Sequence, residues 1–228
     1  MKTLFKVAVL LAAVSATTLF AASITVGSYG GGNCYPFMCN DSGTSSGVSI
    51  DYQQVYNSAR FSGVTTIKTI TYQYYPGFGT PYILGGTYDL YWGYSGVGMG
   101  LTSNLAGNYA GSATYLGTGW GGFNYGKYLT ANVNFTYDPS QGDLILEWIA
   151  NNQDNVPNHF GNGYNWADYT GNGTMRAYCL TNAGCTGAIT GALVTGFNGN
   201  PVPEPGTLVM FGSGLVGLAG LVRRKFNV

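Results

Sequence analysis

The clearest pattern in the chain is a strict alternation of apolar and polar residues over Leu129–Tyr137 (LTANVNFTY). In a β-strand, side chains point alternately to opposite faces, so a pattern that repeats every two residues gives one apolar face and one polar face. The segment therefore predicts a half-buried strand whose polar residues, Thr130, Asn132, Asn134 and Thr136, face water.

A second apolar run, Leu144–Ile149, follows the segment Asp138–Asp143, which contains a proline and a glycine and indicates a turn. Leu144, Leu146 and Trp148 share one face of the returning strand. We therefore expect residues 129–149 to form a β-hairpin.

Further strands are expected at residues 47–56, 67–75, 88–94 and 188–197, and no segment of this region shows a helical period. Short strands separated by glycine-rich turns are typical of packed antiparallel sheets. The sequence predicts an all-β fold, an antiparallel β-sandwich of jelly-roll-like topology.

The first 22 residues have the three parts of a signal peptide. Lys2 and Lys6 precede the apolar run Val7–Val14, and small residues follow. Cleavage sites at Val14-Ser15-Ala16 and at Ala21-Ala22-Ser23 both fit the small-residue rule, and a retained membrane anchor is the alternative. We expect export of the chain.

An uncharged run, Thr207–Val222, lies near the other end of the sequence. Its 16 residues form a helix of about 24 Å, which flanking side chains can adapt to a membrane. The basic residues that follow indicate a cytoplasmic end. A buried core helix is the alternative, and four glycines disfavour it.

A short extended motif precedes this run, because prolines at both ends resist helix formation. The order of motif, apolar run and basic end resembles the PEP-CTERM sorting signal of Gram-negative bacteria. The residues that carry the resemblance are Pro203, Glu204, Pro205, Arg223, Arg224 and Lys225.

The resemblance implies that an exosortase, a membrane protease-transpeptidase, cuts near this motif. The tail is then a transient membrane anchor, and the protein passes to the cell surface or to the exopolysaccharide of a biofilm. The expected organisation is a signal peptide (1–22), an ectodomain (23–198), a linker (199–206), a transmembrane helix (207–222) and a basic tail (223–228).

The ectodomain also resembles a recurrent ectodomain of PEP-CTERM proteins. The resemblance rests on Tyr52–Tyr56 with Phe61–Gly63, on Gly86–Leu90 and on Phe135–Leu146. The segment Tyr91–Tyr94 departs from the pattern, which has a small Ser/Thr-rich strand end, so no ligand is carried over. The resemblance supplies no catalytic motif.

The expected ectodomain has four basic and eight acidic residues, which gives a net charge of −4. An acidic domain with so few cations does not fit the phosphate backbone of a nucleic acid. We expect no nucleic-acid partner.

All four cysteines lie in the exported part, where an oxidising compartment favours disulfides. Their spacing favours the local pairs Cys34–Cys39 and Cys179–Cys185. Pairing between the two halves of the domain is the alternative, with stabilisation of about 4–5 kcal/mol through a longer loop. A zinc site is disfavoured because the chain has one histidine.

Enzymatic chemistry has weak support in the sequence. His159 could act as a general base, but Ser45 lies in a Gly/Ser loop rather than in a nucleophile elbow. Asp143 and Glu147 are about 13 Å apart along one strand face, too far for a glycosidase pair, and are expected in solvent. Oxygen ligands for Ca²⁺ could come from Asp154, Asn155 and Asp168, without a recognised spacing.

The chain has nineteen tyrosines and four tryptophans, more than one core needs. Exposed aromatic rings stack on sugars, and the candidate platforms are Trp92, Trp120 and Trp166. We expect a non-enzymatic surface or matrix protein associated with exopolysaccharide, without cofactor or metal. The alternatives are a carbohydrate-binding module and, third, a secreted hydrolase.

Overall fold

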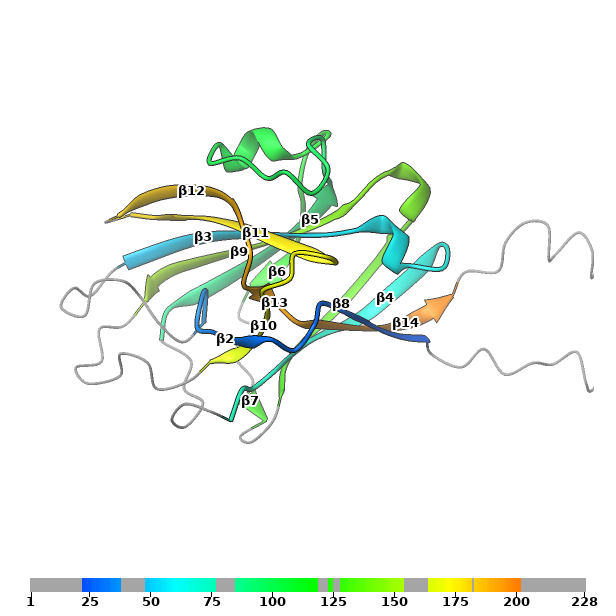
Figure 1. The fold of residues 1–228 in the computed structure, drawn as a ribbon, viewed down its shortest axis with the longest axis horizontal. Helices are drawn as coiled ribbons and strands as arrows, with labels where there is room; N and C mark the ends of the chain where they lie inside the picture. The colour runs from blue at the N-terminus through cyan, green and yellow to red at the C-terminus, as the bar shows by residue number, and fades with distance from the viewer. Residues whose placement is uncertain are drawn as a thin grey trace, which may run out of the picture.

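The computed structural model describes residues 22–37, 48–76, 85–118, 123–124, 128–153, 164–181 and 183–201, which form antiparallel strands (Figure 1). The strands are β1 (Ala22–Val26), β2 (Gly31–Asn33), β3 (Val48–Tyr56), β4 (Thr65–Gln73), β5 (Thr87–Tyr94), β6 (Thr114–Thr118), β7 (Phe123–Asn124), β8 (Tyr128–Tyr137), β9 (Leu144–Gln153), β10 (Asn165–Asp168), β11 (Thr174–Leu180), β12 (Gly184–Ile189), β13 (Ala192–Leu193) and β14 (Thr195–Pro201).

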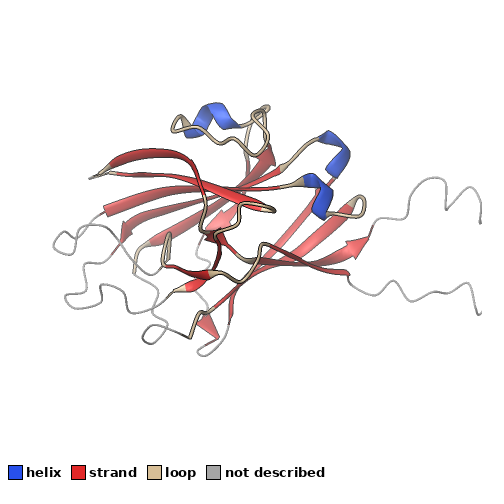
Figure 2. Ribbon diagram, in the orientation of Figure 1, coloured by secondary structure: helices blue, strands red, loops and turns tan. Residues whose placement is uncertain are grey.

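The helical segments among the described residues are short 3-10 turns, coloured blue in Figure 2: η1 (Ser58–Arg60), η2 (Leu105–Asn108) and η3 (Pro139–Gln141). The all-β prediction is therefore confirmed for this part of the chain. Within it, no helix has the length and apolar character that a membrane crossing requires. The expected membrane helix, Thr207–Val222, lies outside the described residues.

Three sheets contain these strands. One has five strands in the order β1-β14-β4-β8-β7, one has six in the order β12-β11-β3-β9-β5-β6, and a small one has the order β13-β10-β2. Most neighbouring strands are distant in the sequence, so the register depends on long-range packing rather than on local turns.

The main core lies between the five-stranded and six-stranded sheets, which face each other through their apolar sides. Aromatic pairs join the two sheets: the rings of Trp92 and Phe135 are 4.6 Å apart, and Trp148 Nε1 donates a hydrogen bond to the Tyr72 hydroxyl at 2.8 Å. Burial of these large side chains supplies most of the stabilisation of the fold.

The alternation in β8 is confirmed. Its apolar residues from Leu129 to Tyr137 are buried in the core between the sheets, while Asn132, Asn134 and Thr136 are exposed and Thr130 is half-buried. The five-stranded sheet thus has one apolar face and one polar outer face.

The predicted hairpin of residues 129–149 is wrong, because β8 pairs with β4 and β7 whereas β9 pairs with β3 and β5. The segment Asp138–Asp143 contains η3 and carries the chain from one sheet to the other. The Tyr137 hydroxyl donates to the Gly142 carbonyl oxygen, and the Asp138 side chain accepts from the Ser140 amide. Local turn chemistry stabilises this corner as well as it would a hairpin.

Both faces of β9 are covered. Leu144 and Leu146 belong to the core between the sheets, while Ile145 packs with Val55 and Leu105 in a second apolar cluster on the other face. Residues 95–113, drawn in green above β5 in Figure 1, cover this face. A polar clamp holds the segment, since the Gln53 side chain donates to the Leu105 carbonyl oxygen and accepts from Asn108.

The predicted closing strand at 188–197 is divided into the end of β12, the short β13 and the start of β14. Gly191 separates the first two, with a φ of 82° that favours glycine. β14 then continues to Pro201 and pairs with β1, where Ala22 lies opposite Gly199. The start of β1 and the end of β14 therefore lie side by side, at the right of Figure 1.

Candidate functional site

A groove of about 360 Å³ lies on the polar outer face of the five-stranded sheet. Its centre is a row of paired residues, or rung, that crosses four neighbouring strands. Thr25 pairs with Gly196, Gly196 with Thr71, and Thr71 with Thr130. The groove is therefore built by register from segments that are far apart in the sequence.

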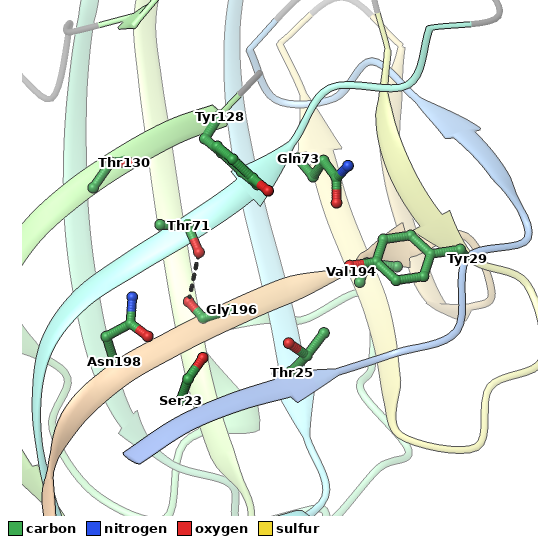
Figure 3. Close-up of a pocket in the computed structure, with 10 residues that line it drawn as sticks. All are labelled: Ser23, Thr25, Tyr29, Thr71, Gln73, Tyr128, Thr130, Val194, Gly196 and Asn198. Atoms are coloured by element: carbon green, nitrogen blue, oxygen red, sulfur yellow. Dashed lines mark hydrogen bonds between the residues drawn. The ribbon is translucent and has the colours of Figure 1, made fainter. Parts of the chain in front are cut away.

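Two tyrosines stand at one end of this groove (Figure 3). Tyr29, in the loop after β1, is 55% exposed, and Tyr128, at the start of β8, is 41% exposed. Gln73 pairs with Tyr128 across the sheet and lies between the two rings in the view of Figure 3. Ser23 and Asn198 face each other across β1 and β14 toward the other end.

The ring of Tyr29 is supported from behind. Its edge-on contact with Trp166 has a centroid distance of 5.4 Å, and Trp166 in turn contacts Tyr75 at 4.4 Å. A ring that is held in place loses little conformational entropy when a ligand stacks on it. The exposed face of Tyr29 is thus a preformed contact surface.

Gly196 forms part of the groove floor. A Cβ atom at this position would collide with the Thr71 hydroxyl, which donates a hydrogen bond to the Gly196 carbonyl oxygen at 3.2 Å (Figure 3). The absence of a side chain here keeps the centre of the groove open between β1 and β4. Glycine in a strand often marks such a close approach.

None of the described residues that line the groove is charged. The polar lining consists of hydroxyl and amide groups from Ser23, Thr25, Thr71, Gln73, Thr130 and Asn198, with the two tyrosine hydroxyls. Lys68 lies on the neighbouring part of β4, and its ammonium group donates a hydrogen bond to the side-chain oxygen of Asn134. Chemically, the groove offers neutral donors and acceptors beside two aromatic faces.

The first expected glycan platform, Trp92, lies at the boundary between the two large sheets. Its ring stacks on Phe135 with an interplanar angle of 26° and is half-buried. The remaining exposed part lines a wide opening of about 640 Å³ together with Tyr115. Trp92 therefore contributes mainly to the core.

The structure does not bring the three expected platforms together. Trp166 lies on β10, half-buried between Tyr29 and Tyr75, so it supports the groove from behind rather than lining it. Trp120 lies outside the described residues.

The two carboxylates expected in solvent are both held by the fold. Glu147 is only 7% exposed; its oxygens accept hydrogen bonds from the Gln53 amide at 2.6 Å and from the Tyr109 hydroxyl at 3.1 Å. Asp143 accepts from the Ser58 amide at 2.7 Å. The expectation that Glu147 is solvated is wrong, because residues 95–113 cover its face of β9.

A second carboxyl, that of Asp51 on β3, lies close to Glu147. Burial removes water from the Asp51 carboxylate, and the nearby negative charge of Glu147 adds to this effect, so the pKa of Asp51 rises to about 8. The pKa of Tyr109 is also raised by burial and by Glu147. Perturbed groups of this kind occur in active sites, but here the packing over Glu147 indicates a structural role.

One of the two expected local disulfides is confirmed. Cys179 and Cys185 are bonded across β11 and β12, where they also pair in register. Cys34 is disulfide-bonded as well, while Cys39 lies outside the described residues. Among the described residues, no group of three potential metal ligands occurs.

The other predicted site residues lie outside the described part of the chain. These are Ser45, the possible Ca²⁺ ligands Asp154 and Asn155, His159, and the sorting-signal residues Pro203, Glu204, Pro205, Arg223, Arg224 and Lys225. The described chain ends at Pro201.

The sequence analysis missed the groove. Its only local signal was the polar side of β8, which placed Thr130 in water, and the same pattern occurs on any solvated strand. Tyr29 and Gln73 carry no motif, and they approach the same groove only through the pairing of the sheet. A strand register would have been needed to find the site.

Comparison with known families finds one match: residues 201–225 match the model for the PEP-CTERM protein-sorting motif. The predicted resemblance of the C-terminal segment is therefore confirmed. The motif implies export, a membrane-anchored precursor and processing by an exosortase. Searches among curated proteins and among solved structures gave no match to the chain.

Proposed function

We propose that the protein is an exported, non-enzymatic component of the cell surface or extracellular matrix that associates with exopolysaccharide. The observation that carries this proposal is the sorting motif at residues 201–225, which begins at the last residue of β14. In this proposal the tail Thr207–Val222 is a transient transmembrane helix, and the two facing sheets form a β-sandwich of jelly-roll type.

The pairing of the start of β1 with the end of β14 supports the proposal. Because Ala22 pairs with Gly199, the segments before β1 and after β14 leave the domain at the same place. A membrane can hold both segments at once without unfolding either strand. The non-enzymatic role rests on the sequence, which has no recognised nucleophile motif.

Deletion of the tail from Pro203 onward tests the proposal. The shortened protein should be exported and released into the medium, because it has lost the membrane-retained segment. A matched truncation that removes only residues 226–228 keeps the motif and should stay with the cells. Retention of the tail-deleted protein in the envelope fraction, at the level of the full chain, would refute the sorting role.

A second candidate function is that of a carbohydrate-binding module. The groove on the five-stranded sheet favours it, since neutral hydroxyl and amide groups lie beside two exposed tyrosine rings. This function is compatible with the first, because a matrix protein that binds polysaccharide would be held in the matrix by that contact.

A further inference from the structure

We propose that the groove on the outer face of the five-stranded sheet binds an uncharged polysaccharide chain, with Tyr29 and Tyr128 as stacking platforms. This inference rests on the proposed function and adds its ligand class and its binding residues. The site differs from the expected tryptophan platforms that the structure describes, since neither Trp92 nor Trp166 lines this groove.

The first argument is the pairing of flat apolar faces with polar edges. A sugar ring presents C–H groups on its faces and hydroxyl groups at its rim, so it requires an aromatic face and hydrogen-bonding groups around it. Tyr29 and Tyr128 supply exposed rings, and Gln73 lies beside Tyr128 in the register of the sheet. The arrangement meets both requirements in one groove.

The second argument is the availability of hydrogen-bonding groups. Among the described residues, no hydrogen bond engages the side-chain amides of Gln73 and Asn198, and each amide can both donate and accept. A sugar hydroxyl also donates and accepts, so one amide can satisfy one hydroxyl or two neighbouring ones. Gln73 and Asn198 lie on the two sides of the Gly196–Thr71 rung and can therefore contact successive sugar units.

The third argument concerns charge. Acidic polysaccharides, phosphates and sulfates are held by arginine or lysine, and neither occurs among the described residues that line this groove. Lys68, on the same strand as Thr71 and Gln73, is hydrogen-bonded to Asn134 outside the groove. The lining therefore favours neutral sugars over uronic acids.

The fourth argument is the shape of the site. The groove crosses β1, β14, β4 and β8. Gly196 has no side chain, so the floor of the groove is lower there than at the neighbouring positions. An open groove admits the middle of a polymer as well as its end. A long chain can thus lie along the rungs and contact several groups weakly, which suits a matrix polymer.

The test uses the full-length chain purified in detergent and affinity electrophoresis in gels that contain one soluble polysaccharide each. The neutral probes are dextran, laminarin and galactomannan, and the acidic probes are alginate and polygalacturonate. We expect at least one neutral polymer to retard the protein, and the acidic polymers to leave its mobility unchanged.

Tyr29→Ala and Tyr128→Ala should each weaken the retardation about tenfold, since each removes one stacking face. Gln73→Ala should weaken it about fivefold through the lost hydrogen bonds. The matched control is Tyr115→Ala, because Tyr115 is also a strand tyrosine, is 51% exposed, and lines the separate opening beside Trp92. Thermal melting of each variant verifies that its fold is unchanged.

Three outcomes would overturn the inference: no retardation by any neutral polymer, equal retardation by alginate, or full binding in the Tyr29→Ala/Tyr128→Ala double variant. Loss of binding in Tyr115→Ala with retention in the double variant would move the site to the Trp92 opening.

Failure of the proposed function can be distinguished from failure of this inference. In that case the wild-type protein would be neither processed nor found at the cell surface. The double variant should be processed normally but washed from the matrix.

Discussion

The side chain of Gln54 pairs with both backbone groups of Leu193. Its Nε2 donates to the Leu193 carbonyl oxygen at 2.6 Å, and its Oε1 accepts from the Leu193 amide at 2.9 Å. Gln54 lies on β3 of the six-stranded sheet, and Leu193 lies in β13 of the small sheet. One side-chain amide thus replaces a β-ladder partner and ties the chain just before β14 to the opposite sheet.

Replacement of Gln54 by leucine should therefore strongly destabilise the domain. The change leaves the buried Leu193 amide unpaired and removes one of the two side-chain hydrogen bonds to the Leu193 carbonyl oxygen, which also accepts from the Thr195 hydroxyl. We expect a cost of about 3 kcal/mol in the free energy of unfolding. Gln54→Glu keeps the acceptor for the Leu193 amide but loses the donor, so it should lie between the wild type and Gln54→Leu at pH 7. Urea unfolding of the three proteins measures the order, and equal stability of Gln54→Leu and wild type would contradict this role.

The raised pKa of Asp51, about 8, predicts that this group makes folding less favourable as the pH rises. Between about pH 4 and pH 8 the folded protein keeps a proton on Asp51 that the unfolded chain releases. The contribution is fully present below the unfolded pKa and is lost as the pH passes through the folded pKa. Asp51→Asn should therefore flatten the decline of the melting temperature between pH 5 and pH 8.

The control for that experiment is Asp138→Asn. Hydrogen bonds from Ser140 lower the pKa of Asp138, so its contribution is present at neutral pH and is lost as the pH falls through the folded pKa. This variant should alter the acid side of the profile and leave the decline toward pH 8 as in the wild type. A profile for Asp51→Asn that runs parallel to the wild type from pH 5 to pH 8 would show that Asp51 titrates normally.

Removal of the Cys179–Cys185 disulfide should lower the free energy of unfolding by about 2 kcal/mol. The two cysteines are six residues apart, so their bond closes a small loop and restricts the unfolded chain only modestly. Urea unfolding of Cys179→Ala/Cys185→Ala measures the change. Added reductant should destabilise this variant further through the remaining bond of Cys34, and a loss above about 5 kcal/mol would indicate a larger role than loop closure.

Replacement of Pro203, Glu204 and Pro205 by alanines should block processing. We expect the mature protein to begin between Thr17 and Ser23 and to end within a few residues of Pro205, because two prolines disfavour a helix and an extended backbone is open to a protease. The alanine variant should insert normally and accumulate as a membrane-bound precursor. Intact mass spectrometry of protein recovered from the cell surface checks both ends, and a released variant of normal mass would show that the motif does not direct the cut.

The sequence predicted the strand β8 because one of its faces meets water, which leaves a clear alternation. It predicted β9 as a strand but assigned the wrong partner. The turn at Asp138–Asp143 has the residues of a hairpin, and the corner that it forms instead depends on contacts such as that between the Asp138 amide and the Tyr94 hydroxyl. Local composition does not distinguish the two.

The site was harder to predict than the fold. Glu147 was expected in water because a charged strand residue usually is, and only the packing of residues 95–113 buries it. The groove depends on single residues such as Tyr29, Gln73 and Asn198, whose types are common on solvated surfaces. Their proximity is a property of the register between β1, β14, β4 and β8, to which no short motif corresponds.

The place of β14 in its sheet has a consequence for the timing of export. β14 lies between β1 and β4 and brings Phe197 into the core, so the five-stranded sheet cannot be completed before residues 195–201 have crossed the membrane. The sorting motif begins at Pro201, so it arrives at the moment when folding can finish. Until then β1 and β4 have open edges, which are prone to aggregation. A tail that pauses in the membrane would hold each molecule apart from its neighbours during this interval, and cleavage would release it after the sheet has closed.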